Sequence, residues 1–425
     1  MRRSILRRAV LCPLTVLLIS APALRAAESR TLTVDECLAR AAARSLALQA
    51  GAARTEAAAS RARQAGRRLN PKLEAEVENV AGTGDVSGFD AAETTLSLAQ
   101  QLELGGKRRH RAAAAEAEAA VSRAEEAVLR NDLLFDTRRA ALAVLAAQAR
   151  LRLAEELLAL ARETEGVAAA RERAGKVTAL ETERARAETA QAELELGDRQ
   201  AGQRDAVREL AALLGETEPS FDAVAGALEI PPTELPSADA LVLRASAHPA
   251  LLAADARTGA LDARVRSEEA ARTPNLEVAA GVRRLQESED FGFVAGVGVE
   301  LPLFNRNRDA VSAAEAEREA ERLDAAAARL QNDAAIRRLR ARLQALAARE
   351  ARLRESVVPP TERALDLLKQ AHAQGKAGYL DVLEARRAVA ETRGSLIDAQ
   401  ADYAAGRIDL DERSGSTAPS VSSVP

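Results

Sequence analysis

The stretch that decides the fold reads RERAGKVTALE at residues 171–181 and returns as QAHAQGKAGYLD at residues 370–381. In both copies a glycine, a lysine, a leucine and an acid keep the same spacing. Two earlier motifs also occur twice: NPKLE at 70–74 matches TPNLE at 273–277, and LELGGKR at 102–108 matches LPLFNRN at 301–307. A tandem repeat of about 200 residues predicts two copies of one structural unit, with two pseudo-equivalent ends.

The composition favours long helices over an ordinary globular core. Aromatic residues make up 2% of the 425 residues, tryptophan is absent, and alanine, glutamate, arginine and leucine dominate, which is typical of coiled coils. Such helices need partners along their length. The net charge is −4, and removing the first 26 residues, with five arginines and no acid, would leave −4 − 5 = −9. A chain this acidic is a poor ligand for nucleic acid, so we expect no nucleic-acid partner.

The first 26 residues are typical of a secretory signal peptide. Basic residues precede an apolar run at residues 10–19, which is too short to cross a bilayer as a helix. Small residues place the cleavage between Ala23 and Ala27. Cys12 lies inside the apolar run rather than after it, so we expect no lipid anchor. The exported chain would be periplasmic, secreted, or held in an outer membrane by β-strands.

Four segments alternate apolar residues with polar residues or glycine, as β-strands do: 72–81, 94–104, 275–284 and 291–303. A turn-rich loop separates the two segments of each half, which predicts one β-hairpin per half. The apolar face would cover a core in a soluble sandwich, or meet lipid in an outer membrane. In the membrane interpretation the acids of the opposite face line a water-filled lumen: Glu74, Glu76, Glu78, Glu103, Glu277 and Glu300.

A sheet in lipid has to close on itself, because lipid cannot satisfy the backbone groups of an open edge. Four strands are too few, since the smallest such barrels have about eight. The barrel would therefore be shared between chains. Three chains would give 3 × 4 = 12 strands, and two or four chains are the other solutions.

Each hairpin is followed by two long helical runs. Residues 107–173 contain almost no helix breaker, and about 65 residues of helix span roughly 100 Å. A second helix is expected at 178–214, and the second half repeats the arrangement at 309–374 and 379–411. Two consecutive prolines, Pro359 and Pro360, are expected to kink or break the first of these later runs.

The predicted fold is therefore mainly α-helical with a small β part, in two tandem repeats. A signal peptide at 1–26 precedes a first repeat at 32–215, which opens with a helix at 33–69. A proline-rich linker at 216–236 leads to a second repeat at 237–413 and a Ser/Pro-rich, disordered tail at 414–425.

The order of helix, hairpin and two long helices, given twice, resembles the outer-membrane efflux proteins of the TolC type. The resemblance covers residues 32 to about 413. LELGGKR at 102–108 and LPLFNRN at 301–307 are similar to the strand-to-helix junctions of the branch that serves heavy-metal efflux, of the cobalt-zinc-cadmium and copper-silver type. GKAGYLDVLEA at 375–385 resembles the family's periplasmic-tip turn, and 175–184 is its weaker copy.

This resemblance implies a homotrimer with a twelve-stranded barrel in outer-membrane lipid and an α-helical tunnel in the periplasm. The far end of the tunnel would dock on a periplasmic adaptor coupled to an inner-membrane efflux pump, and would open like an iris. Heavy-metal cations are the implied cargo, with hydrophobic drugs or secreted protein as alternatives. A soluble periplasmic coiled-coil scaffold is a further alternative, which the duplicated hairpin-plus-helix-pair pattern disfavours.

The resemblance also assigns roles to residues at the tip. The family's acids at the periplasmic aperture fall on Asp381 and Glu384, with Glu181 as the counterpart in the first repeat. Arg184 stands where the first repeat would carry its second acid. Adaptor contact would fall on the tip turns: Gly175, Lys176, Gly375, Lys376, Gly378 and Tyr379.

The residue inventory predicts neither an enzyme nor a metal or cofactor site. His110, His248 and His372 are far apart, and Cys37, the only cysteine after the signal peptide, has no partner at ligand spacing. We expect the histidines on helix surfaces or at caps and Cys37 as a small apolar residue. The GGK sequence at 105–107 lacks the rest of a phosphate-binding loop, and no catalytic set stands out.

Overall fold

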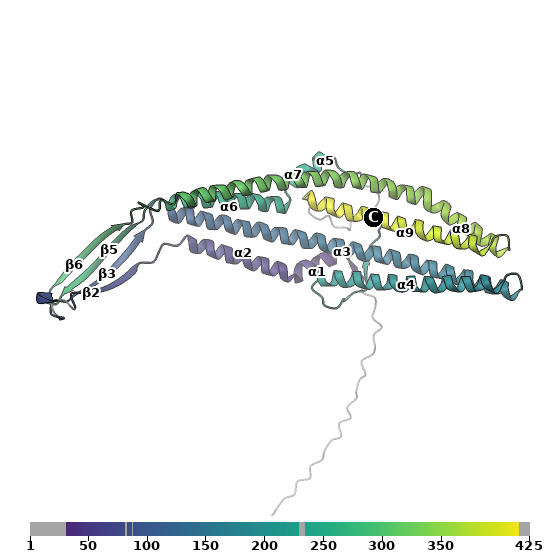
Figure 1. Cartoon of the computed structure of the whole chain (residues 1–425), viewed down its shortest axis with the longest axis horizontal. Helices are drawn as coiled ribbons and strands as arrows, with labels where there is room; N and C mark the ends of the chain where they lie inside the picture. The colour runs from purple at the N-terminus through teal and green to yellow at the C-terminus, as the bar shows by residue number, and fades with distance from the viewer. Residues whose placement is uncertain (1–30, 81–82, 87, 229–233, 416–425) are drawn as a thin grey trace, which may run out of the picture.

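The molecule is a long, gently curved bundle of helices with a β-sheet at one end (Figure 1). The computed structural model describes residues 31–415 except 81–82, 87 and 229–233. The predicted signal peptide and residues 416–425 of the predicted tail lie outside the described residues. Within the described part of the chain, no helix combines the length and the apolar content that crossing a membrane requires.

The sheet contains both predicted hairpins as one antiparallel unit. Its strands are β2 (Lys72–Glu78), β3 (Glu93–Leu102), β5 (Leu276–Leu285) and β6 (Phe291–Val299), in the order β2-β3-β5-β6. The two repeats meet along β3 and β5, so β2 and β6 form the edges of the sheet.

Three strands end before their predicted last residue: β3 by two residues, and β2 and β6 by three and four. β2 stops at Glu78 because Asn79 takes a left-handed conformation, with φ of 58°. β6 stops at Val299, shortly before Pro302, which has no N–H for a ladder hydrogen bond.

The predicted first helix is two helices, α1 (Val34–Arg44) and α2 (Leu46–Ala65). Thr33 caps α1 in a capping box with Glu36, whose backbone N–H donates to Thr33 Oγ1 at 3.2 Å. Ser45 has an extended conformation and separates the two helices, because its hydroxyl caps α2 by accepting from the Leu48 N–H.

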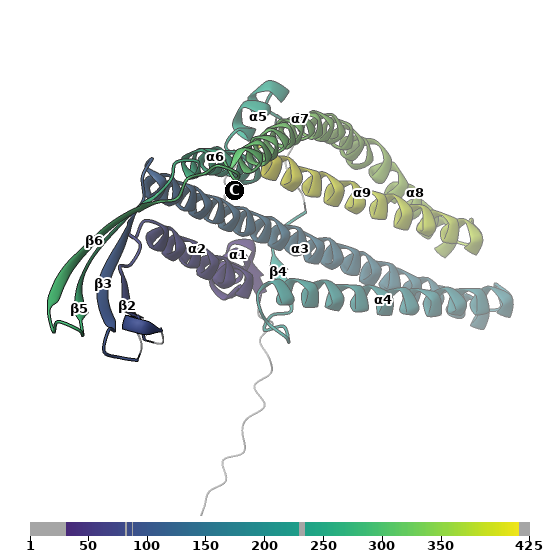
Figure 2. The ribbon, with the colours of Figure 1, turned by 60° about the vertical axis from the view of Figure 1, so that its left-hand side comes forward.

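The long helical runs lie close to their predicted positions. In the first repeat they are α3 (Lys107–Arg173), of 67 residues, and α4 (Ala179–Leu213). In the second repeat, α7 (Arg308–Arg352) and α8 (Val358–Ala373) are separated by a π-helical turn, η2 (Leu353–Val357), which ends one residue before the two prolines. α9 (Tyr379–Arg413) completes the second hairpin. Figure 2 shows the α3–α4 and α8–α9 hairpins as two arms that finish at the same end of the molecule.

A small domain at mid-length joins the repeats and was only partly predicted. The linker contributes β4 (Ala223–Ala225), which pairs in parallel with β1 (Thr31–Thr33). Phe221 and Val224 of the linker are each 2% exposed and pack with Leu210 of α4 and Val144 of α3. This part of the linker is therefore core rather than irregular surface.

Cys37 lies in the same mid-length cluster and is fully buried. Burial raises the pKa of its thiol to about 11, so the thiol is neutral and unreactive at physiological pH. This environment matches the small apolar residue that the sequence predicted.

On the other side of the molecule, α5 (Ala238–Ala245) packs on α7, and α6 (Pro249–Ala271) lies along α3 and α7.

Candidate functional site

Both helical hairpins turn through the same helix-ending motif. Gly175 and Gly375 have left-handed φ angles of 67° and 75°. The N–H of Lys176 donates to the carbonyl of Arg171 at 2.9 Å, and Lys376 donates to Ala371 at 2.8 Å. These six-to-one bonds, together with those from the glycine N–H groups, define a Schellman motif, which explains the glycine in each copy. Both lysines are exposed at the end of the molecule.

The acids after the two turns differ in environment. Asp381 is exposed and caps α9, since its Oδ2 accepts from the Gly378 N–H at 2.8 Å. Glu384 is exposed one turn further along the same helix. Glu181, in the first turn of α4, directs Oε1 toward the second hairpin, where it lies 3.7 Å from His372 Nε2. Asp381 and Glu384 are therefore exposed at the tip, whereas Glu181 faces the second hairpin, where its Oε1 is buried without a hydrogen-bond partner.

His372 lies inside the tip, contrary to the prediction that the histidines lie on surfaces or at caps. It is 3% exposed, because α8 points this face at the first hairpin. Arg171 of α3 donates from Nη1 to the His372 carbonyl at 2.8 Å, and His372 Nδ1 lies 3.1 Å from the Ala377 carbonyl. His248, in contrast, caps α6 as expected, with Nδ1 accepting from the Ala250 N–H.

Tyr379 is the one predicted tip residue that is buried. Its ring lies edge-on to His372, with 6.4 Å between the ring centroids, and packs against Ala168 and Ala185 of the first hairpin. Burial raises the pKa of its phenol. Tyr379 thus holds the two hairpins together, while the glycines and lysines form the outer surface.

Charged side chains tie the two hairpins together above the tip. Lys369 of α8 lies 2.7 Å from Glu163 of α3. Arg386 and Arg387 of α9 both lie 2.6 Å from Glu188 of α4. The main apolar contact at this level is a small cluster formed by Leu365, Val382 and Val389 with partly buried neighbours.

At the other end of the molecule, the strand register gathers the predicted lumen acids on one face. Glu76 pairs with Thr95, and Thr95 pairs with Arg283, so all three point to the same side of the sheet. By the same alternation Glu74, Glu78 and Glu277 share this face. Arg283 lies 2.9 Å from Glu78 and 2.6 Å from Glu93, so a strand cation neutralises part of this charge.

The remaining two predicted lumen acids lie beyond the strands. Glu103 follows β3 and forms an ion pair with Arg111 of α3, which leaves its side chain 9% exposed. Glu103 therefore braces the junction between strand and helix. Glu300 follows the last residue of β6.

The opposite face of the sheet is bare and mostly apolar, with Arg284, Thr94 and Gln100 as its polar members. Phe293 is 95% exposed and Val297 is 72% exposed, and the sheet projects beyond the ends of the helices. The same face carries further exposed apolar side chains: Leu73, Val77, Leu96, Leu98, Val278, Val282 and Phe291. An apolar area of this kind marks a surface that is covered in use.

The described residues contain no group of three or more His, Cys, Asp or Glu side chains arranged to hold a metal ion. The two ends of the molecule therefore differ from a metal site in kind. One end is a sheet with an apolar face and an acid-rich face, and the other is a pair of turns with exposed carboxylates and lysines.

Comparisons with known proteins agree with this architecture. The chain is 29% identical to the cobalt-zinc-cadmium resistance protein CzcC of Cupriavidus metallidurans, over 85% of each chain. It is 32% identical to the nickel-cobalt-cadmium resistance protein NccC of Alcaligenes xylosoxydans xylosoxydans, over 76% of this chain and 72% of that protein. The crystal structure of the outer membrane protein VceC from Vibrio cholerae has the same fold, with a TM-score of 0.75 at 24% identity, covering 90% of this chain and 96% of that one.

The model of the family described as outer membrane efflux protein matches residues 37–216 and 242–416, one match in each repeat. This family is one of transport proteins and not of enzymes. The chain therefore belongs to the outer membrane efflux protein family, the TolC-type channels of tripartite efflux systems, and its location is the outer membrane.

Proposed function

We propose that three copies of this chain form a duct that passes heavy-metal cations from the periplasmic side to the outside of the cell. The single observation that carries the assembly is the four-stranded sheet, which has one bare apolar face and two edges without a partner among the described strands. Three such sheets joined edge to edge give 3 × 4 = 12 strands, with the apolar faces in lipid and the acids around water.

The helices supply the rest of the duct. The 67 residues of α3 extend roughly 100 Å, enough to carry a tunnel from the membrane far into the periplasm. At the far end, the exposed carboxylates of Asp381 and Glu384 form the aperture, where repeated acids attract cations. Glu181 supports that aperture through His372 rather than lining it.

The proposed partners are a periplasmic adaptor and, through it, an inner-membrane efflux pump. The adaptor would contact the exposed tip turns at Gly175, Lys176, Gly375, Lys376 and Gly378, which are the parts of the chain farthest from the sheet. Tyr379 would support the contact surface without touching the adaptor, because its ring is buried.

Metal cations are proposed as cargo because the curated relatives are named for resistance to cobalt, zinc, cadmium and nickel. No cation-binding cluster is needed for this role, since a conduit can pass ions that the pump has selected.

The function is tested by deleting the gene and measuring growth across zinc, cobalt, cadmium, nickel, copper and silver salts, with hydrophobic drugs in parallel. Sensitivity to metals alone, restored by the intact gene, is the expected result. Sensitivity to drugs alone would replace the metal assignment by a general efflux duct. Crosslinking of the protein in outer-membrane fractions should give a trimer, and a monomer there would contradict the assembly.

A further inference from the structure

The helices meet the four-stranded sheet at one level, where the chain crosses four times between them. The crossings are residues 66–71, 103–111, 268–275 and 300–309, and together they form what we call the collar. All four strands have one end here, since β2 and β5 begin at the collar and β3 and β6 end at it. Figure 1 shows the strands leaving the helical bundle at this level. The collar is therefore the boundary between the sheet and the helices.

Hydrogen bonds between the crossings hold the collar together. Arg111 Nε donates to the carbonyl of the last residue of α2, at 2.9 Å. Lys107 Nζ donates to Asn275 Oδ1 at 2.7 Å, which joins the start of α3 to the start of β5. Asn307 Nδ2 donates to the Glu268 carbonyl at 2.9 Å, which joins the starts of α7 and the end of α6. The collar is therefore one continuous surface rather than four separate loops.

The collar is positively charged although the whole chain is acidic. It contains nine Lys or Arg residues and five Asp or Glu residues, so its net charge is 9 − 5 = +4, against −4 for the whole chain. Seven of the cations are exposed and form no ion pair with an acid of the described chain: Arg67, Arg68, Arg108, Arg109, Arg272, Arg306 and Arg308.

The charge of the collar is shared by the two repeats. At the offset of 199 positions that relates Leu102 to Leu301, Arg109 corresponds to Arg308. Both repeats therefore carry an arginine at the same place in the first turn of their long helix.

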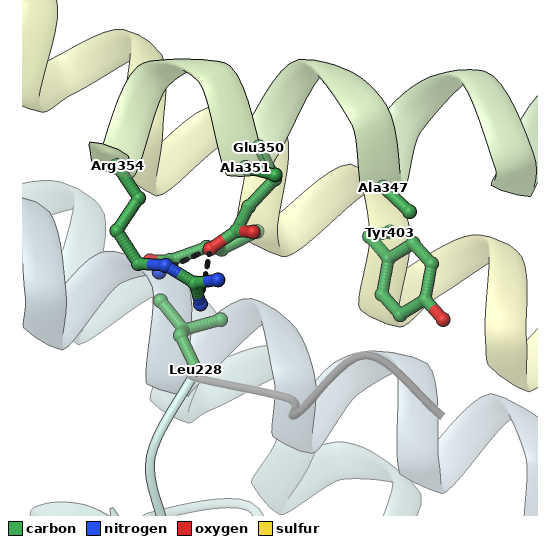
Figure 3. Close-up of a pocket in the computed structure, with 7 residues that line it drawn as sticks. Leu228, Ala347, Glu350, Ala351, Arg354 and Tyr403 are labelled. Atoms are coloured by element: carbon green, nitrogen blue, oxygen red, sulfur yellow. Dashed lines mark hydrogen bonds and ion pairs between the residues drawn. The ribbon is translucent and has the colours of Figure 1, made fainter. Parts of the chain in front are cut away.

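Several arginines elsewhere on the helices are held by acids of the chain. Arg264 of α6 lies 2.6 Å from Glu317 of α7. Arg354 of η2 lies 3.2 Å from Glu350, one turn earlier on the same helical run (Figure 3). These cations are neutralised within the chain, whereas the seven of the collar are left for a partner outside it.

Bare apolar side chains lie directly beside the cations of the collar. Leu301, Leu303 and Phe304 follow the last residue of β6 and are 68%, 62% and 100% exposed. The residue equivalent to Phe304 in the first repeat is Gly105 (304 − 199), so the second repeat has added an aromatic ring that packs on nothing in its own chain. Apolar residues of this kind mark a surface that is covered in use.

The order of these surfaces is that of a membrane boundary. The apolar face of the sheet comes first, then the apolar residues 301–304, and then Arg306 and Arg308. β5 has ten residues, the length that a tilted strand needs to cross the hydrocarbon of a bilayer. In the proposed assembly the collar lies at the periplasmic edge of that hydrocarbon, where lipid phosphates are found. Guanidinium groups bind phosphate through paired hydrogen bonds.

Other occupants fit the collar less well. The collars of neighbouring copies carry the same charge and repel each other. The proposed adaptor contact lies at the opposite end of the molecule. An anionic phospholipid supplies a negative charge for the arginines and acyl chains for the apolar residues beside them.

We propose that the collar binds the headgroups of anionic phospholipids in the periplasmic leaflet of the outer membrane. The arginines contact the phosphates, and Phe304 lies among the upper parts of the acyl chains. The inference rests on the proposed function, because it requires the sheet in lipid and the helices in the periplasm. Through this contact the collar selects the lipids around the duct and fixes its depth in the membrane.

The test uses the absence of tryptophan from the chain. Phe304→Trp in the full-length protein places a single indole at the collar. The protein is reconstituted in phosphatidylcholine vesicles that contain a fixed fraction of brominated phosphatidylglycerol or brominated phosphatidylcholine, because bromine quenches an indole that it contacts. At about 0.05 M salt the association constant obtained from quenching should favour phosphatidylglycerol by about fivefold, the effect of one arginine near a charged lipid surface. The preference should shrink at about 1 M salt, where charges are screened.

Two sets of three substitutions locate the preference. Arg108→Gln, Arg306→Gln and Arg308→Gln together should bring the ratio of association constants to about one. The matched set consists of exposed arginines of α4 and α7 away from the collar, Arg204→Gln, Arg349→Gln and Arg352→Gln, and should leave the ratio unchanged. Equal effects of the two sets would overturn the proposal.

The Phe304→Trp protein decides the proposal even if the collar set fails to assemble, because a ratio near one without further substitutions would also overturn it. Sodium phosphate and sodium chloride are compared at equal ionic strength. If phosphate alone removes the preference, the collar binds free phosphate and the lipid assignment is wrong.

Val297→Trp separates this proposal from the proposed function. Val297 is 72% exposed on the apolar face of the sheet, so an indole there should be quenched by both brominated lipids. Quenching at position 297 with none at position 304 would overturn the collar and leave the sheet in lipid. Quenching at neither position would overturn both.

Discussion

His372 Nε2 of α8 lies 3.7 Å from Glu181 Oε1 of α4, although the two residues are 372 − 181 = 191 positions apart. The two side chains lie at the tips of different repeats. Glu181 of the first repeat is the equivalent of Asp381 in the second repeat. Asp381 instead caps its own helix. Two acids that the duplication makes equivalent therefore have different partners, and removing them should have different effects.

The charge of Glu384 should control the ion preference of the aperture. We expect Glu384→Gln to lower the ratio of cation to anion permeability in planar bilayers, because it removes an exposed carboxylate at the proposed aperture. Glu181→Gln should change the ratio less, since its carboxylate points into the chain. Asp198→Asn, an exposed acid of α4 farther from the tip, is the control. An equal change in that control would contradict the assignment of Glu384.

Two glycines of the second hairpin should respond to alanine with opposite signs. Gly375→Ala should destabilise the protein by about 1–2 kcal/mol, because φ is 75° and an L side chain is strained there. Gly394→Ala should stabilise it by about 0.5–1 kcal/mol, since this position is helical with open space around it. Thermal unfolding in detergent gives both values, and a shift of the same sign in both variants would refute this account of the turn.

Glu216 should give the mid-length domain a pH-dependent stability. Burial alone would raise the pKa of this carboxyl, but hydrogen bonds from Ser220 and the charges of Arg44 and Arg40 outweigh it and lower the pKa below its ordinary value of 4.5. A lowered pKa stabilises the folded state above pH 4.5, and the stabilisation is lost as the pH falls through the folded value.

Glu216→Gln should therefore lower stability at pH 7 by about 1–3 kcal/mol, from the loss of charge-assisted hydrogen bonds. The difference between the variant and the unaltered protein should shrink as the pH falls below 4.5. Melting curves at several pH values check this, with the exposed Glu218→Gln as a matched control. A difference that stays constant across pH would exclude the charge of Glu216 as its cause.

Phe293 should be essential to insertion. In the proposed assembly it faces lipid, and Phe293→Arg should cost about 2–4 kcal/mol near the bilayer midplane. Assembled protein in outer-membrane fractions should fall severalfold. Glu76→Arg introduces the same residue on the acid-bearing face of the sheet and should assemble normally. Equal losses in both variants would mean that the two faces do not differ in their surroundings.

The elements with a clear period could be predicted from the sequence. Alternation placed all four strands of the sheet, and the absence of breakers placed α3 and α4 to within a few residues. The prolines at 359 and 360 marked the interruption of the second long helix, although they do not specify a π-turn. These successes depend on local signals.

Interactions between distant segments could not be predicted in the same way. β1 and β4 have three residues each, too few for a period, and their pairing depends on burial of Phe221 and Val224. In an alanine-rich helix the sequence around His372 does not show which face is covered, so its burial was missed. Its position one turn before the tip glycine was the only local signal.

The edges of the sheet have a consequence for the amount of protein a cell must make. β2 and β6 each pair with one described strand, which leaves a row of backbone donors and acceptors open on either side. In the proposed assembly only further copies of the chain pair with these edges. Each finished duct therefore requires several chains to associate. While unassembled chains are in excess, the number of ducts then rises more steeply than the chain concentration, and a modest fall in expression removes a disproportionate share of export capacity.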